Sequence, residues 1–585
     1  MGNYLNGANR RYKMQDIEDA SDFYKAIDRK RLTHELSSEH PYVYWTMEVY
    51  DKANGIKGGG GLGVLAADTR RVAEQLEVPF VVVTPFYREE VHQGMQDLKQ
   101  TEHVETAMPH DYGYTFIDDV LVKTKDSNDT QLSIFEKRLG STRFVTVSEP
   151  NFGALYSGDG SSDHRLYQEV ALGFGGYKAL RKVGVRPAVI QLNETATIFA
   201  AIARLDELCS NGMNVYEAII YVRKHTLYTN HTLVQAAEGE FTFEQFEQHV
   251  FPNIKSLAVQ HWVAEQFSLD GRLRLSALAI ELAEAKNGVS RLHARVTDFR
   301  DSSGERVKFH AVTNGIDMTT WVHPEILRFY GERGILDKFG LVTDDYKDRL
   351  PEVTAADIRR LKLLGRREMN TALAGRKDQY GQPIFVPEDA LLFDFKRRFV
   401  AYKRPYMPFE QLDKLKQILV DNNAHYILAG KVWMGDKEMY NHLYDLLRVV
   451  DKDPVLKERV HYIQDYDEIV GRALAIGSDV AINVPEVGLE ACGTSWEKDI
   501  ANLGLLISTA DGGVADVLPP ACLEVRGSSY ADEVMSLYEQ MRYATRVLKD
   551  DVELEKVVHR QLAAYLPIIS GARMLKDYLR YLFDR

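Results

Sequence analysis

Short apolar runs alternate with stretches of helical periodicity along most of the chain. In the first half, strands are predicted for PYVYWTMEVY, VPFVVVTPF, RPAVIQLNE and the end of LYTNHT, and helices for LGVLAADTRRVAEQLE and TATIFAAIARLDELC. In the second half, strands are predicted for RRFVAYKR, AHYILAGK, ERVHYIQDY, DVAINVPE and LGLLISTADGG, separated by helices such as KEMYNHLYDLLRVV. Strands that alternate with helices are typical of parallel sheets covered on both faces. The pattern therefore predicts an α/β protein.

The two runs of alternation predict two α/β domains. The break is placed near VTNGIDMTTWVHP, which gives an N-terminal domain of residues 1–317 and a C-terminal domain of residues 318–585. From about Ser528 onward the pattern is wholly helical. Ligands of such folds bind outside the carboxyl ends of the strands, so we expect the site in a cleft between the two domains.

Composition and charge narrow the classes of partner. The chain has 585 residues, enough for two large cores, and its 72 Lys and Arg against 85 Asp and Glu give a net charge of −13. Without a compact basic run, this balance argues against nucleic acid or an anionic membrane as the main partner. No apolar run approaches the length of a bilayer span.

The three cysteines predict a reducing compartment. They are widely spaced, contain no CxxC pair, and form neither a disulfide framework nor a zinc site: Cys209, Cys492 and Cys522. The N-terminal segment MGNYLNGANRRYK also lacks the apolar region of a secretory signal. We therefore expect a cytoplasmic protein.

A glycine-rich loop, GIKGGGGLGVLAAD, contains G-x-G-x-x-G at Gly58, Gly60 and Gly63. A dinucleotide loop needs an apolar strand directly before it and an acidic residue about 20 positions later. Here the preceding DKANGIK is polar and no acid follows VPFVVVTPF, which disfavours NAD. Two interpretations stay open: glycines that let backbone N–H groups approach an anion, or a flexible loop without a ligand.

A second candidate is LEACGTSWEKDIANLG. Thr494 and Glu497 have the spacing of a capping box, which predicts a helix that starts at Thr494 with N–H groups available to a phosphate. Lys498 lies on the same face, and an amine beside a phosphate site suits pyridoxal phosphate. An ordinary surface lysine is the alternative.

Two further groups of polar residues have both a functional and a structural interpretation. RRFVAYKR brings four cations together, which could bind a dianion or could form a solvated basic edge: Arg397, Arg398, Lys403 and Arg404. Asparagine and histidine side chains near strand ends suit either sugar hydroxyls or loop and cap positions: Asn193, Asn230, His231, Asn287, His293 and Asn314.

Taken in order, these motifs resemble the α-glucan (glycogen, starch, maltodextrin) phosphorylase family from Tyr42 to Gly513. The matching segments are GGGGLGVLAAD, QLNE, TNHT, NGVSRLH, VTNGI, RRFVAYKR, AGK, DYD and EACGTSWEK. The resemblance implies a GT-B fold of two Rossmann-like domains with the active site in the cleft between them. It also implies phosphorolysis of a terminal α-1,4 bond of an α-glucan or oligosaccharide, giving α-glucose 1-phosphate with retention. The phosphate of pyridoxal 5′-phosphate would act as general acid and base, and family members are commonly homodimers.

The resemblance implies a role for individual residues. Lys498 would form the Schiff base, and the cofactor would also contact Thr494, Gly61, Arg397 and Tyr466. Inorganic phosphate or the phosphate of a sugar 1-phosphate would be held by Arg398 and Lys403, and direct roles in the reaction are also predicted for His231 and Glu490. The substrate would contact Gly60, Gly61, Leu62, His231, Asn314, Tyr402, Glu490, Ala491, Cys492 and Gly493.

The chain departs from the family pattern near the QLNE and EACGTSWEK motifs. Ala196 stands where the family usually has histidine, and Leu503 stands where glycine is expected. Trp496 is expected to reshape the sugar or acceptor site, and the charge of Glu497 to disfavour a nearby phosphate unless it caps the helix. Two alternatives therefore stay open: a retaining glycosyltransferase that uses a sugar nucleotide, and a carbohydrate-binding homologue with altered catalysis.

Overall fold

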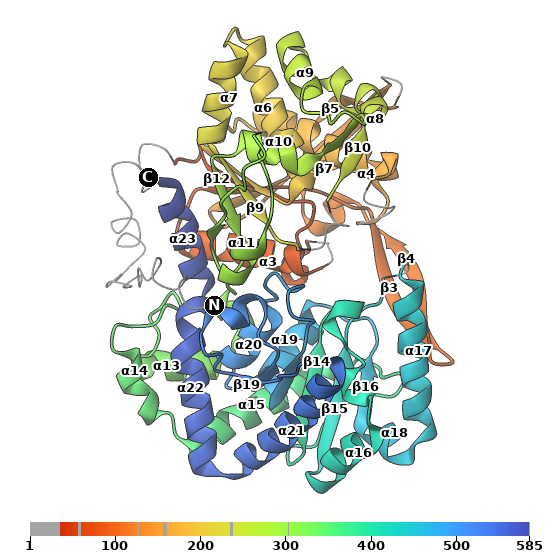
Figure 1. Ribbon diagram of the computed structural model, residues 1–585, viewed down its shortest axis with the longest axis vertical. Helices are drawn as coiled ribbons and strands as arrows, with labels where there is room; N and C mark the ends of the chain where they lie inside the picture. The colour runs from red at the N-terminus through yellow and green to blue at the C-terminus, as the bar shows by residue number, and fades with distance from the viewer. Residues whose placement is uncertain are drawn as a thin grey trace.

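The computed structural model describes residues 36–56, 60–125, 128–155, 161–233, 238–301, 303–433 and 435–583. The protein is α/β, with two large sheets that lie at opposite ends of the longest axis (Figure 1). Gly58 of the glycine-rich loop lies outside the described residues. Within those residues, no helix is long and apolar enough to cross a membrane.

The first sheet is mixed. Within the described ranges it has nine strands in the order β13-β12-β9-β8-β1-β2-β7-β6-β5. Their bounds are β1 (Tyr42–Trp45), β2 (Phe80–Pro85), β5 (Thr115–Lys123), β6 (Asp129–Leu139), β7 (Thr142–Ser148), β8 (Val189–Asn193), β9 (Thr226–Asn230), β12 (Ala285–Gly288) and β13 (His310–Ala311). Strand β6 runs antiparallel to both β5 and β7, so the prediction of wholly parallel sheets is wrong for this edge. The other neighbouring pairs in this sheet are parallel.

Helices, one hairpin and one further antiparallel strand pair accompany the first sheet. The helices are α3 (Gly61–Gln75), α4 (Asp163–Val170), α5 (Gly176–Lys182), α6 (Phe199–Ser210), α7 (Val215–Lys224), α8 (Phe243–His249), α9 (Leu257–Ala264), α10 (Leu275–Leu282) and α11 (Arg291–Val296). The hairpin is β3 (Glu89–Gln96) with β4 (Lys99–Thr106), and the antiparallel pair is β10 (Glu240–Thr242) with β11 (Arg272–Arg274), which α8 and α9 separate in the sequence.

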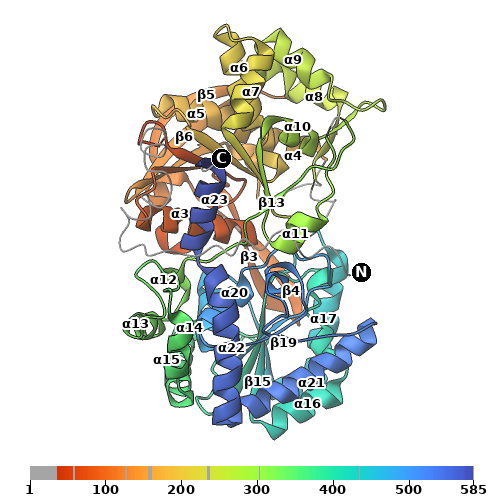
Figure 2. The same ribbon diagram turned by 60° about the vertical axis from the view of Figure 1, so that its left-hand side comes forward.

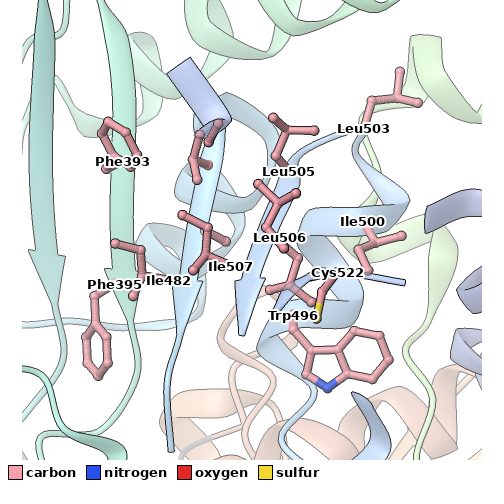
Figure 3. Packing of buried hydrophobic residues seen from close by; sticks show 14 of the residues in the cluster. Phe393, Phe395, Ile482, Trp496, Ile500, Leu503, Leu505, Leu506, Ile507 and Cys522 are labelled. Atoms are coloured by element: carbon pink, nitrogen blue, oxygen red, sulfur yellow. The ribbon is translucent and has the colours of Figure 1, made fainter. Parts of the chain in front are cut away.

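The second sheet is wholly parallel, as its continuous apolar runs predict. In the described part of the chain its six strands have the order β16-β15-β14-β17-β18-β19. They are β14 (Leu391–Lys396), β15 (Ala424–Ala429), β16 (Val460–Ile463), β17 (Val480–Asn483), β18 (Leu505–Ser508) and β19 (Leu523–Glu524). Phe393, Phe395, Ile482 and Ile507 point from these strands into one buried core (Figure 3).

The helices of the second half follow the predicted alternation. They are α12 (Met318–Trp321), α13 (Pro324–Glu332), α14 (Tyr346–Arg349), α15 (Ala355–Leu373), α16 (Leu412–Asp421), α17 (Lys437–Lys452), α18 (Pro454–Arg459), α19 (Glu468–Gly477), α20 (Ser495–Ala501), α21 (Tyr530–Lys549), α22 (Asp551–Ile569) and α23 (Gly571–Phe583). The chain after Ser528 is helical, as expected.

The segment RRFVAYKR is not a strand. Strand β14 ends at Lys396, and a 3-10 turn follows at Ala401–Lys403. A strand would place successive side chains on opposite faces. The irregular backbone instead lets the side chains of Arg397 and Lys403 approach the same carboxylate.

The hairpin β3–β4 and helix α23 are two of the segments that pack across the two halves of the protein. The hairpin β3–β4 reaches α17, where the hydroxyl of Tyr440 donates to the backbone oxygen of Gln100 at 2.9 Å. Helix α23 lies beside α3 in both views (Figures 1 and 2), and its Leu575 and Leu579 share a buried cluster with Ala66 and Val72 of α3. Helix α23 thus packs on the first half of the protein. The domain boundary at residue 317 stays a prediction.

Candidate active site

The loop before α20 and the helix itself hold several predicted site residues. The helix begins at Ser495, directly after Thr494, as predicted. The capping box is wrong: the Thr494 side chain makes no capping hydrogen bond, and its φ of −92° and ψ of 0° differ from the extended backbone of typical caps. Glu497 instead has a side chain with 0% exposure, and the Cys492 thiol lies 3.8 Å from its Oε1.

Burial changes what Glu497 contributes to the site. It raises the pKa of the Glu497 carboxyl far above its ordinary value, although Arg573 and Lys498 oppose that shift. Burial thus favours the uncharged form of the carboxyl. This weakens the repulsion between Glu497 and a phosphate that the sequence suggests.

Trp496 is a core residue. Its indole is 2% exposed, belongs to the core of the second sheet (Figure 3), and meets the Tyr565 ring of α22 edge-on with ring centroids 5.0 Å apart. It is therefore not available to contact a sugar, and the expectation that Trp496 reshapes the sugar or acceptor site by direct contact is wrong.

Replacing this indole should destabilise the fold. Trp496→Ala leaves a large cavity, and we expect it to lower the free energy of unfolding by roughly 3–5 kcal/mol. Chemical denaturation measures this loss. Trp433→Ala is the control, because Trp433 is 54% exposed and its loss should change stability by no more than about 0.5 kcal/mol. Equal effects of the two variants would contradict the core assignment.

Lys498 is buried, not a surface lysine. It is 8% exposed, and its Nζ lies 3.2 Å from the centroid of the Trp321 ring. The same indole donates from Nε1 to Asp68 Oδ2 at 2.8 Å. Burial lowers the pKa of Lys498 to about 8, against the opposing attraction of Asp68. A useful fraction of the amine is therefore neutral and nucleophilic near neutral pH.

Asp68 and Trp321 link Lys498 to the helix that follows the glycine-rich loop. Asp68 lies on α3, and it also accepts from Arg71 Nη1 at 3.0 Å. Arg71 in turn pairs with Glu468 of α19 at 2.8 Å. A chain of buried polar contacts thus joins the first half of the protein to the second around the Lys498 amine.

A cluster of cations surrounds Glu490. Lys403 Nζ donates to Glu490 Oε2 at 2.6 Å, and Arg397 Nη1 lies 3.4 Å from the same oxygen. Burial lowers the pKa of Lys403 to about 8 although Glu490 opposes the shift. Burial also disfavours ionised Glu490, but Lys403 and Arg397 together hold its pKa below the ordinary value. Arg398, by contrast, is exposed.

Arg397 connects this cluster to α20. Its Nε donates to Ser495 Oγ at 2.8 Å, while its Nη2 is buried and has no hydrogen-bond partner within the described residues. A Cβ atom at Gly493 would lie 2.5 Å from that Nη2, so the glycine leaves room for the guanidinium. Ser495 and Lys498 are three residues apart and share one side of α20. The amine and the guanidinium therefore lie near the same turn of one helix.

Polar residues of the first half also contact the loop that precedes α20. Asn314 Nδ2 donates to the backbone oxygen of Cys492 at 3.1 Å, and its buried Oδ1 has no partner in the described part of the chain. Ser290 Oγ donates to the backbone oxygen of Ala491 at 2.7 Å. These contacts bring the end of the first sheet to the predicted sugar-contact residues.

His231 follows strand β9 at the same end of the first sheet. Its backbone N–H donates to Glu194 Oε1 at 2.9 Å, and its Nε2 lies 2.9 Å from Asn193 Oδ1. Burial lowers the pKa of His231 to about 3, so the ring is neutral at physiological pH.

The structure gives a reason for glycine at position 60 but not at position 61. Gly60 has a φ of +91°, and a Cβ there would lie 2.7 Å from Glu48 Oε2. Gly61 opens α3, is exposed, and among the described residues has no atom within 4 Å of an added Cβ. Leu62 is half-buried and packs against a cluster that includes Met574. The protein's own packing therefore explains Gly60 but not Gly61.

The sequence-predicted residues fall into separate groups in the structure. Glu490, Lys403 and Arg397 are in direct contact, whereas His231 and Leu62 pack within the first half. Burial raises the pKa of Tyr466 above its ordinary value, and Arg397 partly opposes this shift. Tyr402 is half-buried, and burial raises its pKa to about 12.

Sequence reasoning missed four residues of the site. Ser290, Trp321 and Ser495 contact predicted residues, and Asp68 accepts from Trp321 and raises the pKa of Lys498 electrostatically. Asp68 ends the GGGGLGVLAAD motif, and Trp321 ends VTNGIDMTTW, so both lay within segments already singled out. Their place beside Lys498 depends on tertiary structure that no single segment reveals.

The sequence matches a known protein family. A model of the carbohydrate phosphorylase family matches residues 181–567, which include every predicted second-half site residue but not the glycine-rich loop. The chain belongs to the carbohydrate phosphorylase family.

Individual relatives are distant. A maltodextrin phosphorylase of Thermococcus litoralis is 27% identical over 522 residues, covering 81% of this chain and 61% of the relative. A glycogen phosphorylase of Aquifex aeolicus is 24% identical over 651 residues, covering 98% of this chain and 91% of the relative. A glycogen phosphorylase of Mycobacterium tuberculosis is 28% identical over 508 residues, covering 77% of this chain and 58% of the relative. The chain thus spans about three fifths of two of these relatives.

Proposed function

We propose that this protein is an α-glucan phosphorylase that cleaves a terminal α-1,4 bond with inorganic phosphate and releases α-glucose 1-phosphate with retention. The observation that carries the proposal is the buried amine of Lys498 on the same helix turn as Ser495, which Arg397 contacts, with Lys403 and Glu490 adjoining. Family membership supports it, and so do relatives named maltodextrin and glycogen phosphorylases.

The proposal includes a GT-B arrangement with the site between two Rossmann-like domains, divided near residue 317. Support comes from first-half residues that contact the second-half loop: Asn314 reaches Cys492, and Ser290 reaches Ala491. The wholly parallel second sheet also fits, because its strands end toward ligand sites in such folds.

Pyridoxal phosphate fits the donor set. Family members generally use this cofactor. Lys498 supplies a buried amine of lowered pKa, and Arg397 Nη2, which has no partner in the part of the chain that the structure describes, supplies a donor for a phosphate oxygen. Thr494, Gly61 and Tyr466 would complete its surroundings. When bound, the cofactor supplies a phosphate group with a second pKa of about 6, which can donate and accept a proton near neutral pH.

The protein's own residues would position the two substrates. Lys403 and Arg398 would bind the substrate phosphate and offset its charge. Glu490, held ionised by its cations, would accept hydrogen bonds from sugar hydroxyls, together with Tyr402 and the loop residues Ala491, Cys492 and Gly493. His231 is neutral, so it can donate or accept a hydrogen bond without adding charge.

The direct test is phosphate-dependent release of α-glucose 1-phosphate from maltoheptaose by the purified protein loaded with pyridoxal phosphate. We expect steady release with phosphate and none without it. Glycosyl transfer from ADP-glucose or UDP-glucose without any need for phosphate would instead identify a sugar-nucleotide glycosyltransferase. Maltoheptaose binding without turnover of any of these donors would identify a carbohydrate-binding homologue.

A further inference from the structure

A groove of about 540 Å³ lies directly beside the Glu490 loop. Two of its lining residues, Tyr402 and Leu489, immediately precede Lys403 and Glu490 in the sequence. Tyr530 and Glu533, from the first turn of α21, form another part of its wall. Tyr402 is itself a proposed sugar-contact residue, and the charge of Glu490 acts on its phenol, so the groove adjoins the proposed site at Tyr402. Most of the other lining residues have no role in the proposed reaction.

The charges of the groove argue against an anionic ligand. Arg404 lines it, but every guanidinium nitrogen already has a protein acceptor: Nε donates to Val484 O at 2.7 Å, Nη2 to Pro485 O at 2.9 Å, and Nη1 pairs with Glu533. Glu486 also lines the groove, and within the described residues its carboxylate has no hydrogen-bond or ion-pair partner. An anion entering here would meet an unpaired carboxylate and a cation that is already engaged.

The remaining polar groups suit a neutral polyhydroxyl ligand. In the described part of the chain, the hydroxyls of Tyr402 and Tyr406 have no protein hydrogen-bond partner, and burial raises the pKa of both. They therefore remain neutral phenols that can donate and accept. Sugar hydroxyls can donate to the Glu486 carboxylate and exchange hydrogen bonds with the phenols, while the apolar faces of sugar rings pack against tyrosine rings.

We propose that this groove is an accessory subsite that holds a neutral α-glucan chain next to the residues that contact the reacting sugar. The inference rests on the proposed function for the identity of the sugar. It adds Tyr406, Glu486 and Tyr530 to the residues that bind the chain.

The subsite is tested by the binding of maltoheptaose to the full-length protein, measured by calorimetry. Tyr406→Ala removes a ring and a hydroxyl, and Glu486→Gln removes the charged acceptor. We expect each to raise the dissociation constant roughly tenfold, because a hydrogen bond to a charged group or a packed ring contributes about that much. Tyr406→Phe keeps the ring and should show a smaller increase, which also controls for folding.

Two control substitutions of the same residue types are made at exposed positions that do not line the groove. Tyr216→Ala removes a 70% exposed tyrosine on α7, and Glu458→Gln neutralises an exposed glutamate on α18. Neither should change the dissociation constant. Wild-type affinity for maltoheptaose in both Tyr406→Ala and Glu486→Gln would overturn the subsite.

The outcomes separate this inference from the proposed function. If phosphorolysis is absent but maltoheptaose binding falls in Tyr406→Ala and Glu486→Gln, the subsite stands and the reaction does not. If phosphorolysis occurs and both variants keep the wild-type KM and affinity for maltoheptaose, the reaction stands and the subsite does not. ADP is the anionic probe: binding of ADP that weakens in Tyr406→Ala would also overturn the assignment to a neutral glucan.

Discussion

Lys498→Ala is expected to abolish both uptake of pyridoxal phosphate and release of α-glucose 1-phosphate. The substitution removes a buried amine whose surroundings, Trp321 and Asp68, come from other segments and should stay in place. Uptake is measured from the absorbance of the bound cofactor and from the mass of the protein after borohydride reduction. Lys457→Ala, at an exposed lysine of α18, is the control and should leave uptake unchanged. Cofactor retained covalently by Lys498→Ala would contradict the assignment.

The pH dependence of uptake gives this prediction a second readout. Only the neutral amine attacks an aldehyde, and burial lowers the pKa of Lys498 to about 8. For the cofactor-free protein, the rate of uptake should therefore rise with pH up to about 8 and then level off. An ordinary lysine, with a pKa of about 10.4, would keep accelerating over roughly two further pH units. A midpoint near that ordinary value would show that the amine is solvated in solution.

Gly61→Val is expected to lower kcat/KM by roughly a hundredfold or more while leaving the melting temperature close to that of the wild type. The position of an added Cβ has no atom of the described ranges within 4 Å, so the side chain would project into the space proposed for the substrate and cofactor phosphates. Gly331→Val is the matched control, because Gly331 also lies in a helix with no atom within 4 Å of its Cβ position. Full activity of Gly61→Val would remove the glycine-rich loop from the site.

Gly60 cannot serve for the same test. Its φ of +91° and the 2.7 Å approach of an added Cβ to Glu48 make any substitution strained. Loss of activity in a Gly60 variant would therefore report a displaced loop as readily as a blocked site. The comparison of the two glycines separates a requirement of the backbone from a requirement of the ligand.

The sequence predicted the buried strands well because their apolar runs carry the signal directly. All six strands of the second sheet in the described residues pair in parallel, and four of them, β15 to β18, lie within segments chosen for their apolar runs. The antiparallel edge formed by β5 and β6 was missed, because these strands alternate apolar residues with many charged ones and are only partly buried. RRFVAYKR was misassigned since its alternation resembles a strand, whereas attraction to Glu490 draws two of its cations to one point.

The sequence motifs predicted which residues belong to the site, but they did not predict the burial and pKa shifts of those residues. Lys498 and the residues around it follow from the order of the segments, yet nothing local shows that the amine is buried against Trp321 or lies near Asp68. Glu497 illustrates the limit most clearly. Its spacing from Thr494 is that of a capping box, but the structure buries the side chain, and burial raises the pKa of its carboxyl. Long-range packing overrode a local preference there.

The packing of α23 against α3 has a consequence for the order in which the protein is made. Helix α3, which carries Asp68 and begins at the glycine-rich loop, is translated long before its partners Leu575 and Leu579. Until these leucines emerge, part of the apolar surface of α3 is uncovered, and one wall of the proposed site lacks their support. The nascent chain therefore completes this wall only after Leu579 has emerged, and the exposed apolar surface of its first half must avoid aggregation until then.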